Sequence, residues 1–176
     1  MNRKQVNFKN IPDELKKLDQ WVLWKAMQKP GEKKLRKVPF SIAGYEAKVS
    51  DPSTWGSFKK VMDIYHNSFV YGIGFVFSDN DPYCGIDFDI MNNGVIDWIN
   101  KFSSYTEYSQ SGKGVHIIVK GKKPGDRCKN PKKNYEIYDS DRYFVFTGNL
   151  YHPKLNTVGE RQKEIKTKLR NTMKII

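Results

Sequence analysis

The sequence predicts an α+β fold whose sheet is mostly antiparallel. β-branched and aromatic residues form several short runs separated by turn residues, a pattern typical of strands. A smaller number of segments carry apolar residues at helical spacing, and the two kinds of segment come in a mixed order. The 176 residues contain no internal repeat and no low-complexity run, so one domain is the simplest interpretation.

The first half of the chain is expected to contain a short helix over 12–18, a strand over 21–26 and a second short strand over 37–42. Ser50 or Asp51 is suited to cap the helix that follows. That helix is identified by four apolar residues at helical spacing, Phe58, Val61, Met62 and Tyr65.

The second half is expected to be richer in strands. Two β-rich runs, 71–77 and 84–90, are separated by a turn-rich segment, and a helix over 95–102 follows them. Four further strands are expected over 105–109, 115–120, 135–138 and 143–147. The stretch 158–174 is basic and is expected to be helical.

The composition indicates a polyanionic partner. Lysine and arginine number 31 against 19 acidic residues, a net charge of +12, and nucleic acid is the commonest such partner. Hydrophobic residues at 38% exclude a disordered basic tail. No apolar run approaches the roughly 18 residues of a membrane span, so no membrane partner is expected. Two cysteines, Cys84 and Cys128, are too few for a disulfide framework or a Cys-rich zinc site, which predicts a reduced intracellular protein without zinc.

The positive charge is concentrated in two segments that also contain Pro-Gly turns, so both are expected to be loops. Such loops can follow the phosphates of a nucleic acid without reading its sequence, although a charged surface that only promotes solubility is the alternative. The residues expected to bind DNA are Lys29, Lys33, Lys34, Arg36, Lys122, Lys123, Arg127 and Lys129.

Asp87 and Asp89 form the sharpest candidate site. Side chains alternate faces along a strand, so both carboxylates are expected on one face, with Ile86, Phe88 and Ile90 pointing into the core. Two neighbouring carboxylates repel each other unless a cation lies between them. Mg²⁺ prefers such an all-oxygen setting, with substrate phosphates completing its coordination shell. The alternative is a solvated strand face.

The segment Ser111–His116 (SGKGVH) is the second candidate. Its two glycines allow the backbone to approach a bound group closely, and His116 is expected opposite the apolar side chains of the next strand. Lys113 is followed by Gly114 rather than Ser or Thr, so this is not a Walker A loop. A purely structural histidine is the alternative.

The third candidate is Glu136, an acid inside an aromatic and aliphatic strand. Burying it there costs free energy unless a metal or a cation compensates its charge. Arg142 stands at the start of the next predicted strand, where its guanidinium could bind a triphosphate. The alternatives are an edge-strand glutamate and a surface arginine.

In this order, the three motifs resemble those of the archaeo-eukaryotic primase superfamily, and most closely the primase-polymerase (prim-pol) domains of phages, plasmids and other mobile elements. The family's first motif corresponds to Asp87 and Asp89, its second, small-x-His, to Gly114-Val115-His116, and its third to Glu136. The likeness extends over roughly 21–149 and also includes Trp21–Lys25, Lys37–Phe40, Ser50–Pro52, Gly72–Phe75 and Arg142–Phe144.

The resemblance implies an RRM-like catalytic sheet with a smaller N-terminal α/β unit. It places the catalytic domain in residues 1–155 and a basic helical tail in 156–176, the start of an accessory domain that the chain does not contain. The implied catalytic residues are Asp87, Asp89, His116 and Glu136, with the three acids holding Mg²⁺ or Mn²⁺. The implied nucleotide-binding residues are Ser111, Lys113, His116, Arg142 and Lys37.

The resemblance further implies template-directed nucleotidyl transfer, as a DNA polymerase and primase in the replication of a phage or mobile element. The expected partners are single-stranded DNA template, primer, dNTP or NTP, and a separately encoded helicase or accessory protein, in the cytoplasm of a bacterial host cell. A metal-dependent nuclease using the same acids, or a non-catalytic single-stranded-DNA-binding module, is the alternative. A rolling-circle nicking enzyme fits less well because it needs paired metal-binding histidines.

Overall fold

The chain divides into two compact units in the computed structural model. The first comprises Met1–Val76 and Tyr143–Gly148, and the second comprises Phe77–Arg142 and Asn149–Ile176. The structure describes residues 5–28, 31, 35–130 and 134–173. Within these residues, the helices are too short or too polar to cross a membrane.

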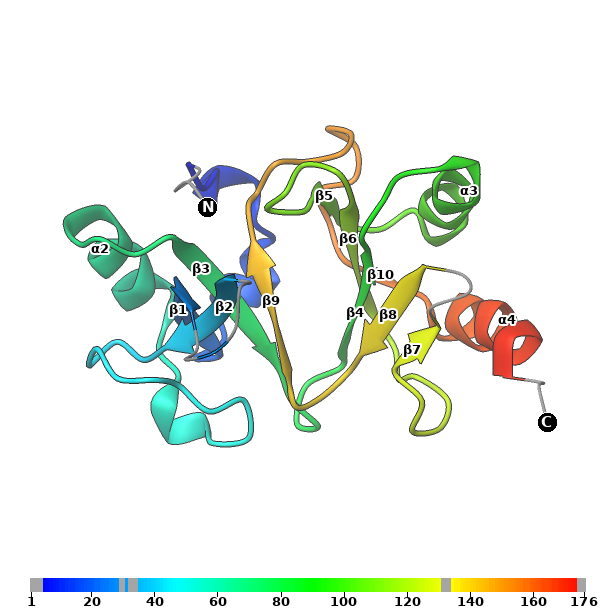
Figure 1. The fold of residues 1–176 in the computed structure, drawn as a ribbon. Helices are drawn as coiled ribbons and strands as arrows, with labels where there is room; N and C mark the ends of the chain where they lie inside the picture. Colours follow the sequence, from blue (N-terminus) through cyan, green and yellow to red (C-terminus); the bar gives the residue numbers. More distant parts are fainter. Residues whose placement is uncertain (1–4, 29–30, 32–34, 131–133, 174–176) are drawn as a thin grey trace. The chain divides into compact units, whose positions relative to one another are not determined.

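The first unit is built on a four-stranded sheet in the order β2-β1-β3-β9 (Figure 1). β1 is antiparallel to both of its neighbours. The elements of this unit are η1 (Phe8–Asn10), α1 (Asp13–Lys16), β1 (Trp21–Gln28), β2 (Leu35–Phe40), η2 (Pro52–Thr54), α2 (Phe58–Asn67), β3 (Gly72–Phe77) and β9 (Arg142–Phe146).

Aromatic packing holds the first sheet against α2. The fully buried ring of Trp21 makes edge contacts with Phe58 of α2, Phe75 of β3 and Phe146 of β9, with ring centroids 4.9, 5.2 and 5.3 Å away. Trp21 therefore belongs to the core of the first unit. The N-cap of α2 is Ser57, whose side chain accepts a hydrogen bond from the Lys60 amide.

The predicted cap was wrong because Asp51 caps a different element. Its side chain accepts a hydrogen bond from the Ser53 amide at the start of the short helix η2, which ends before α2 begins. The prediction assigned the cap of η2 to α2, because the sequence does not clearly mark the break between these two helices.

The second unit is built on a six-stranded sheet in the order β10-β6-β4-β8-β7, with β5 also paired to β6. The pairings among β4, β5, β6, β7 and β8 are antiparallel, whereas β10 runs parallel to β6. The elements are β4 (Tyr83–Phe88), α3 (Asn93–Phe102), β5 (Thr106–Tyr108), β6 (Val115–Lys120), β7 (Lys129–Asn130), β8 (Tyr135–Tyr138), β10 (Gly159–Glu160) and α4 (Gln162–Met173).

Helices α3 and α4 lie on the same side of the second sheet (Figure 1). Their apolar residues share one buried cluster with alternate residues of β4, β6 and β8, which leaves the remaining alternate residues on the other face. The cluster includes Ile86, Phe88, Ile99, Phe102, Val115, Ile117, Ile137, Ile165 and Leu169.

The α+β class and the mostly antiparallel sheets are confirmed. The end of β4 differs from the prediction, because the strand stops at Phe88 and Asp89 lies beyond it. Ile90 is 59% exposed, so its predicted place in the core was wrong: face alternation ends where the ladder ends. The two-residue strands β7 and β10 were not predicted.

Candidate active site

One row of cross-strand partners crosses the second sheet from β5 to β7. Glu107 pairs with His116, His116 with Asp87, Asp87 with Glu136, and Glu136 with Lys129. Directly opposed residues of neighbouring strands project from the same face, so all five side chains lie on the face opposite α3 and α4. We call these residues the polar row.

Three predicted site residues are therefore brought together by register. Asp87, His116 and Glu136 come from three separate strands, and each lies one residue from an end of its strand. Apolar neighbours such as Ile86 and Ile117 fix which face each one takes, because they are buried against the helices. The register thus creates the site from three otherwise ordinary strands.

His116 is held between two carboxylates. Its Nδ1 lies 3.1 Å from Oε1 of Glu107, and its Nε2 lies 3.7 Å from Oδ1 of Asp87. The side chains of Glu107, His116 and Asp87 are 0%, 6% and 28% exposed. Exposure thus increases along the row from Glu107 to Asp87, and Asp87 is the member of this trio most open to solvent.

Glu107 was not predicted as a site residue. Its signal was the same as that of Glu136, an acid within a short aromatic strand, but no motif drew attention to it. The Tyr105 hydroxyl donates a 2.7 Å hydrogen bond to Oε2 of Glu107. Burial, followed by the charge of Glu107, raises the pKa of the Tyr105 hydroxyl well above its usual value, so Tyr105 remains a donor.

Glu136 is compensated by cations. Lys129 Nζ and Arg142 Nη2 lie 2.7 and 3.3 Å from its carboxylate, and the Tyr138 hydroxyl donates to it at 2.9 Å. Burial alone would raise the pKa of Glu136, but the hydrogen bonds from Lys129 and Tyr138 and the charges of Lys129 and Arg142 lower it below its usual value. The carboxylate form is therefore favoured.

Arg142 belongs to the group of side chains around Glu136. Its guanidinium lies over the ring of Tyr138, 4.7 Å from the centroid, in addition to its ion pair with Glu136. The residue expected to bind a triphosphate thus stands beside the polar row, on the side of Glu136.

Asp89 is exposed just beyond the end of β4. Its backbone is approached closely by Gly114, where an added Cβ would lie only 1.8 Å from the Phe88 carbonyl oxygen and 2.7 Å from that of Asp89. The amide of Met91 also donates to the Lys113 carbonyl at 3.0 Å. Gly114 is therefore required to seat the loop before β6 against the residues that carry the two aspartates.

That loop uses several of its own polar groups internally. The Gly112 amide donates to the Ser109 carbonyl, and the Lys113 amide donates to the Ser111 hydroxyl at 3.2 Å. The side chains of Ser111 and Lys113 are exposed. An anion at this loop would consequently meet side chains rather than these two amides.

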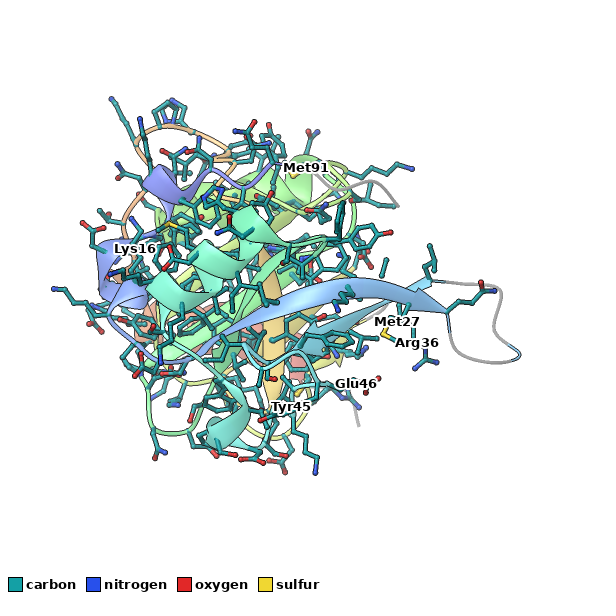
Figure 2. The ribbon with its side chains drawn as sticks, turned by 90° about the vertical axis from the view of Figure 1, so that its left-hand side faces the viewer. Lys16, Met27, Arg36, Tyr45, Glu46 and Met91 are labelled. Atoms are coloured by element: carbon teal, nitrogen blue, oxygen red, sulfur yellow. The ribbon has the colours of Figure 1, made fainter. Side chains whose placement is uncertain are left out.

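The residues expected to bind DNA are distributed over both units. Lys29, Lys33 and Lys34 lie outside the described residues. Arg36 lies on β2 of the first unit, next to Lys37, which was expected to bind nucleotide. Figure 2 shows Arg36 near Met27, its partner across the β1–β2 hairpin. The other four lie in the second unit: Lys122, Lys123, Arg127 and Lys129.

The second basic segment is anchored to α4. Gln162 accepts a 2.8 Å hydrogen bond from the Lys122 amide and donates a 2.9 Å bond to its carbonyl. The Lys123 amide donates to the buried Asp139 at 2.9 Å. The backbone that carries these lysines is therefore held by side chains of the second unit.

Asp87 and Asp89 supply the oxygen donors that Mg²⁺ and Mn²⁺ prefer. Across the described part of the chain, however, no group of three His, Cys, Asp or Glu side chains is arranged so that it could hold a metal ion. Glu136 is turned toward its cations instead. The donor types fit a divalent metal, and the third acid would have to leave its ion pairs to join it.

No protein-family model matches the chain. Over 151 residues the chain is 32% identical to a protein named DNA primase-polymerase from Nitratiruptor phage NrS-1. The chain contains a primase-polymerase domain of the phage type. The match covers 78% of this chain but 20% of that relative, so the chain spans about a fifth of the relative's length.

The second unit of this prim-pol domain carries the whole ordered motif set. The first aspartate, the histidine and the later acid share the polar row, and the second aspartate follows at the end of β4. The resemblance identified from the motifs is thereby confirmed at the level of the family.

Proposed function

We propose that this chain performs template-directed nucleotidyl transfer on DNA, as a polymerase and primase in phage replication. The observation that carries the proposal is the placement of Asp87, His116 and Glu136 in one row of a chain related to a phage DNA primase-polymerase. The net charge of +12 supports a nucleic-acid partner, which we propose to be single-stranded template and primer.

In the proposed mechanism, Asp87 and Asp89 would hold Mg²⁺ or Mn²⁺, joined by Glu136 if Lys129 and Arg142 release it. When bound, such a metal would lower the pKa of a primer hydroxyl and neutralise charge on the leaving pyrophosphate. His116 contacts the phosphates of the incoming dNTP or NTP through Nε2, the nitrogen that faces Asp87. Ser111, Lys113 and Arg142 contribute further phosphate contacts.

On the same proposal, Lys37 and the basic residues of both units bind nucleotide or DNA phosphates. A helicase or accessory protein encoded separately would complete the replication machinery, and the work would take place in the cytoplasm of a bacterial host cell.

The test is extension of primed and unprimed templates with dNTPs or NTPs, in Mg²⁺ and in Mn²⁺. The double variant D87A/D89A should lose extension by at least a hundredfold while still binding single-stranded DNA. The matched control is D97A/E160A, which removes two exposed acids outside the polar row and should extend primers normally. Full extension by D87A/D89A would refute the proposed roles.

A non-catalytic single-stranded-DNA-binding module is the second candidate, because Glu136 is engaged by two cations. That function predicts DNA binding without extension in every nucleotide and metal condition. A nuclease, the third class, would shorten labelled DNA in the absence of nucleotides. The same assay therefore separates all three functions.

A further inference from the structure

We propose that Glu107 is a positioning residue, whose carboxylate holds the His116 imidazole through Nδ1 so that Nε2 is presented to a phosphate of the incoming nucleotide. This inference rests on the proposed function, since the phosphate contact is a part of it. It adds a residue that lies outside the three motifs and was not among the predicted site residues.

The burial of Glu107 is the first argument. Its side chain is 0% exposed, and a carboxylate in such surroundings costs free energy unless hydrogen bonds compensate it. Tyr105 donates to Oε2 at 2.7 Å, and Oε1 lies 3.1 Å from His116 Nδ1. The two oxygens of this acid are thus directed to two different side chains.

The chemistry of the contact sets the state of the ring. An ionised carboxylate accepts hydrogen bonds and donates none, so the nitrogen that faces it must carry a proton. The Glu107 carboxylate therefore requires a proton on Nδ1 of His116. A bound phosphate oxygen, which also only accepts, requires a second proton on Nε2, the nitrogen that lies 3.7 Å from Asp87. Such a carboxylate behind a histidine is the usual means of fixing a ring's tautomer and orientation at a reactive site.

The backbone keeps Glu107 in this place. β5 is paired on one side with β6, where Glu107 is opposite His116. On its other side, the Tyr108 amide donates to the Asn149 carbonyl and the Tyr151 amide donates to the Thr106 carbonyl. A strand held along both edges cannot withdraw the carboxylate without breaking these bonds, so the contact is built into the sheet.

The first experiment determines the state of the ring in the unmodified protein. Long-range ¹H–¹⁵N correlation spectra distinguish Nδ1–H from Nε2–H, and His116 is assigned among the three histidines by the signal lost in H116Q. We expect Nδ1 to carry a proton at neutral pH. A neutral ring protonated only at Nε2 would overturn the proposal. This measurement needs no Glu107 variant and is decisive even if such a variant does not fold.

The second experiment measures nucleotide use in E107Q, which removes the charge and keeps the size of the side chain. The KM for the incoming nucleotide should rise about tenfold, with kcat changed less than about threefold, because a charge-assisted hydrogen bond is lost behind a binding group. The control E160Q removes an exposed acid from the same sheet and should leave KM unchanged. A KM for E107Q equal to that of the control would contradict the proposal.

The third experiment tests whether Glu107 acts through His116. In an H116Q background, E107Q should change KM by less than about twofold further, because residues that act through one contact are not additive. A full tenfold further effect would show that Glu107 acts independently of His116, and the proposal would fall.

The outcomes separate this inference from the proposed function. If the unmodified protein extends no primer under any condition, the proposed function fails, and the ring spectrum still decides whether Glu107 holds His116. If extension is normal but E107Q behaves as E160Q does, the proposed function stands and the role of Glu107 fails.

Discussion

Two acids that face each other across β4 and β8 have different partners. Asp87 lies beside His116, whereas Glu136 is surrounded by Lys129, Tyr138 and Arg142. Their shared row makes them candidates for one site, and their partners give them separate electrostatic environments. Variants of Glu136 and of its partners therefore show how strongly the cations of the second unit determine the ionisation of this acid.

Replacing Lys129 by alanine should raise the pKa of Glu136, because the lysine supplies both the strongest hydrogen bond and a charge that lower it. Carboxyl ¹³C titration without added divalent metal measures this change. The control is K101A, which removes an exposed lysine of α3 on the side of the sheet opposite Glu136. No change in the Glu136 titration is expected for this variant. An unaltered titration in K129A would contradict the assignment of Lys129 as the partner.

The same shift predicts an acid dependence of stability. Because the folded state lowers the pKa of Glu136, the ionised form stabilises the fold above the unfolded pKa, near 4.5, and this contribution disappears as the pH falls through the folded pKa. E136Q should therefore lose less unfolding free energy than the unmodified protein between pH 6 and pH 3, measured by urea unfolding. An equal loss in both proteins would show that this carboxylate contributes nothing.

An added side chain at Gly114 would clash with the backbone of the neighbouring strand. An alanine there would place its Cβ 1.8 Å from the Phe88 carbonyl oxygen, so the loop or the end of β4 must move. We expect G114A to lower the free energy of unfolding by about 2–4 kcal/mol and to reduce primer extension. The control G125N, where nothing lies within 4 Å and a φ of +70° suits asparagine, should cost less than about 1 kcal/mol. Equal losses in the two variants would contradict this steric account.

At the scale of elements, helix α3 covers one face of the second sheet and leaves the other face to the polar row. Asn92 caps it through the Val95 amide, and its residues Val95, Ile99 and Phe102 are buried against the sheet. The ring of Trp98 stacks on that of Phe102 with centroids 5.4 Å apart. Because one face is covered in this way, the alternate strand residues of the polar row lie on the other.

Two isoleucines one turn apart on α3 test this arrangement. I99A should lower the free energy of unfolding by about 2–5 kcal/mol, because the side chain is 1% exposed and its removal leaves a cavity. I96A removes the same atoms from a side chain that is 37% exposed and should cost less than about 1 kcal/mol. Thermal or urea unfolding measures both variants, and a similar cost would contradict the assigned face.

At the scale of the whole molecule, the net charge of +12 predicts salt-sensitive binding of single-stranded DNA. Each neutralised phosphate contributes about −0.7 to the slope of log K against log salt concentration, so K122Q/K123Q should reduce the slope by about 1.4. The control K59Q/K60Q changes two adjacent exposed lysines of α2 and should not alter it. Fluorescence anisotropy over a salt series gives both slopes, and an unchanged slope in K122Q/K123Q would exclude these lysines from binding.

Much of the fold followed from local patterns. Strands β6 and β8 begin and end at the predicted residues, because runs of β-branched and aromatic residues are bounded there by turn residues. The end of β4 and the short strands β7 and β10 did not follow, since each is set by pairing with another strand. The cap of α2 was missed although the hydrogen bond from the Lys60 amide to Ser57 is local. Local propensity says little about where a ladder stops.

The sequence by itself determined the ordered motifs, the excess of positive charge and the family to which they point, because these are properties of residue type and spacing. Only the tertiary structure placed Glu107 behind His116 and two cations around Glu136. Strand register decides such neighbours, and register is set by burial of the opposite face against α3 and α4 rather than by the polar residues themselves.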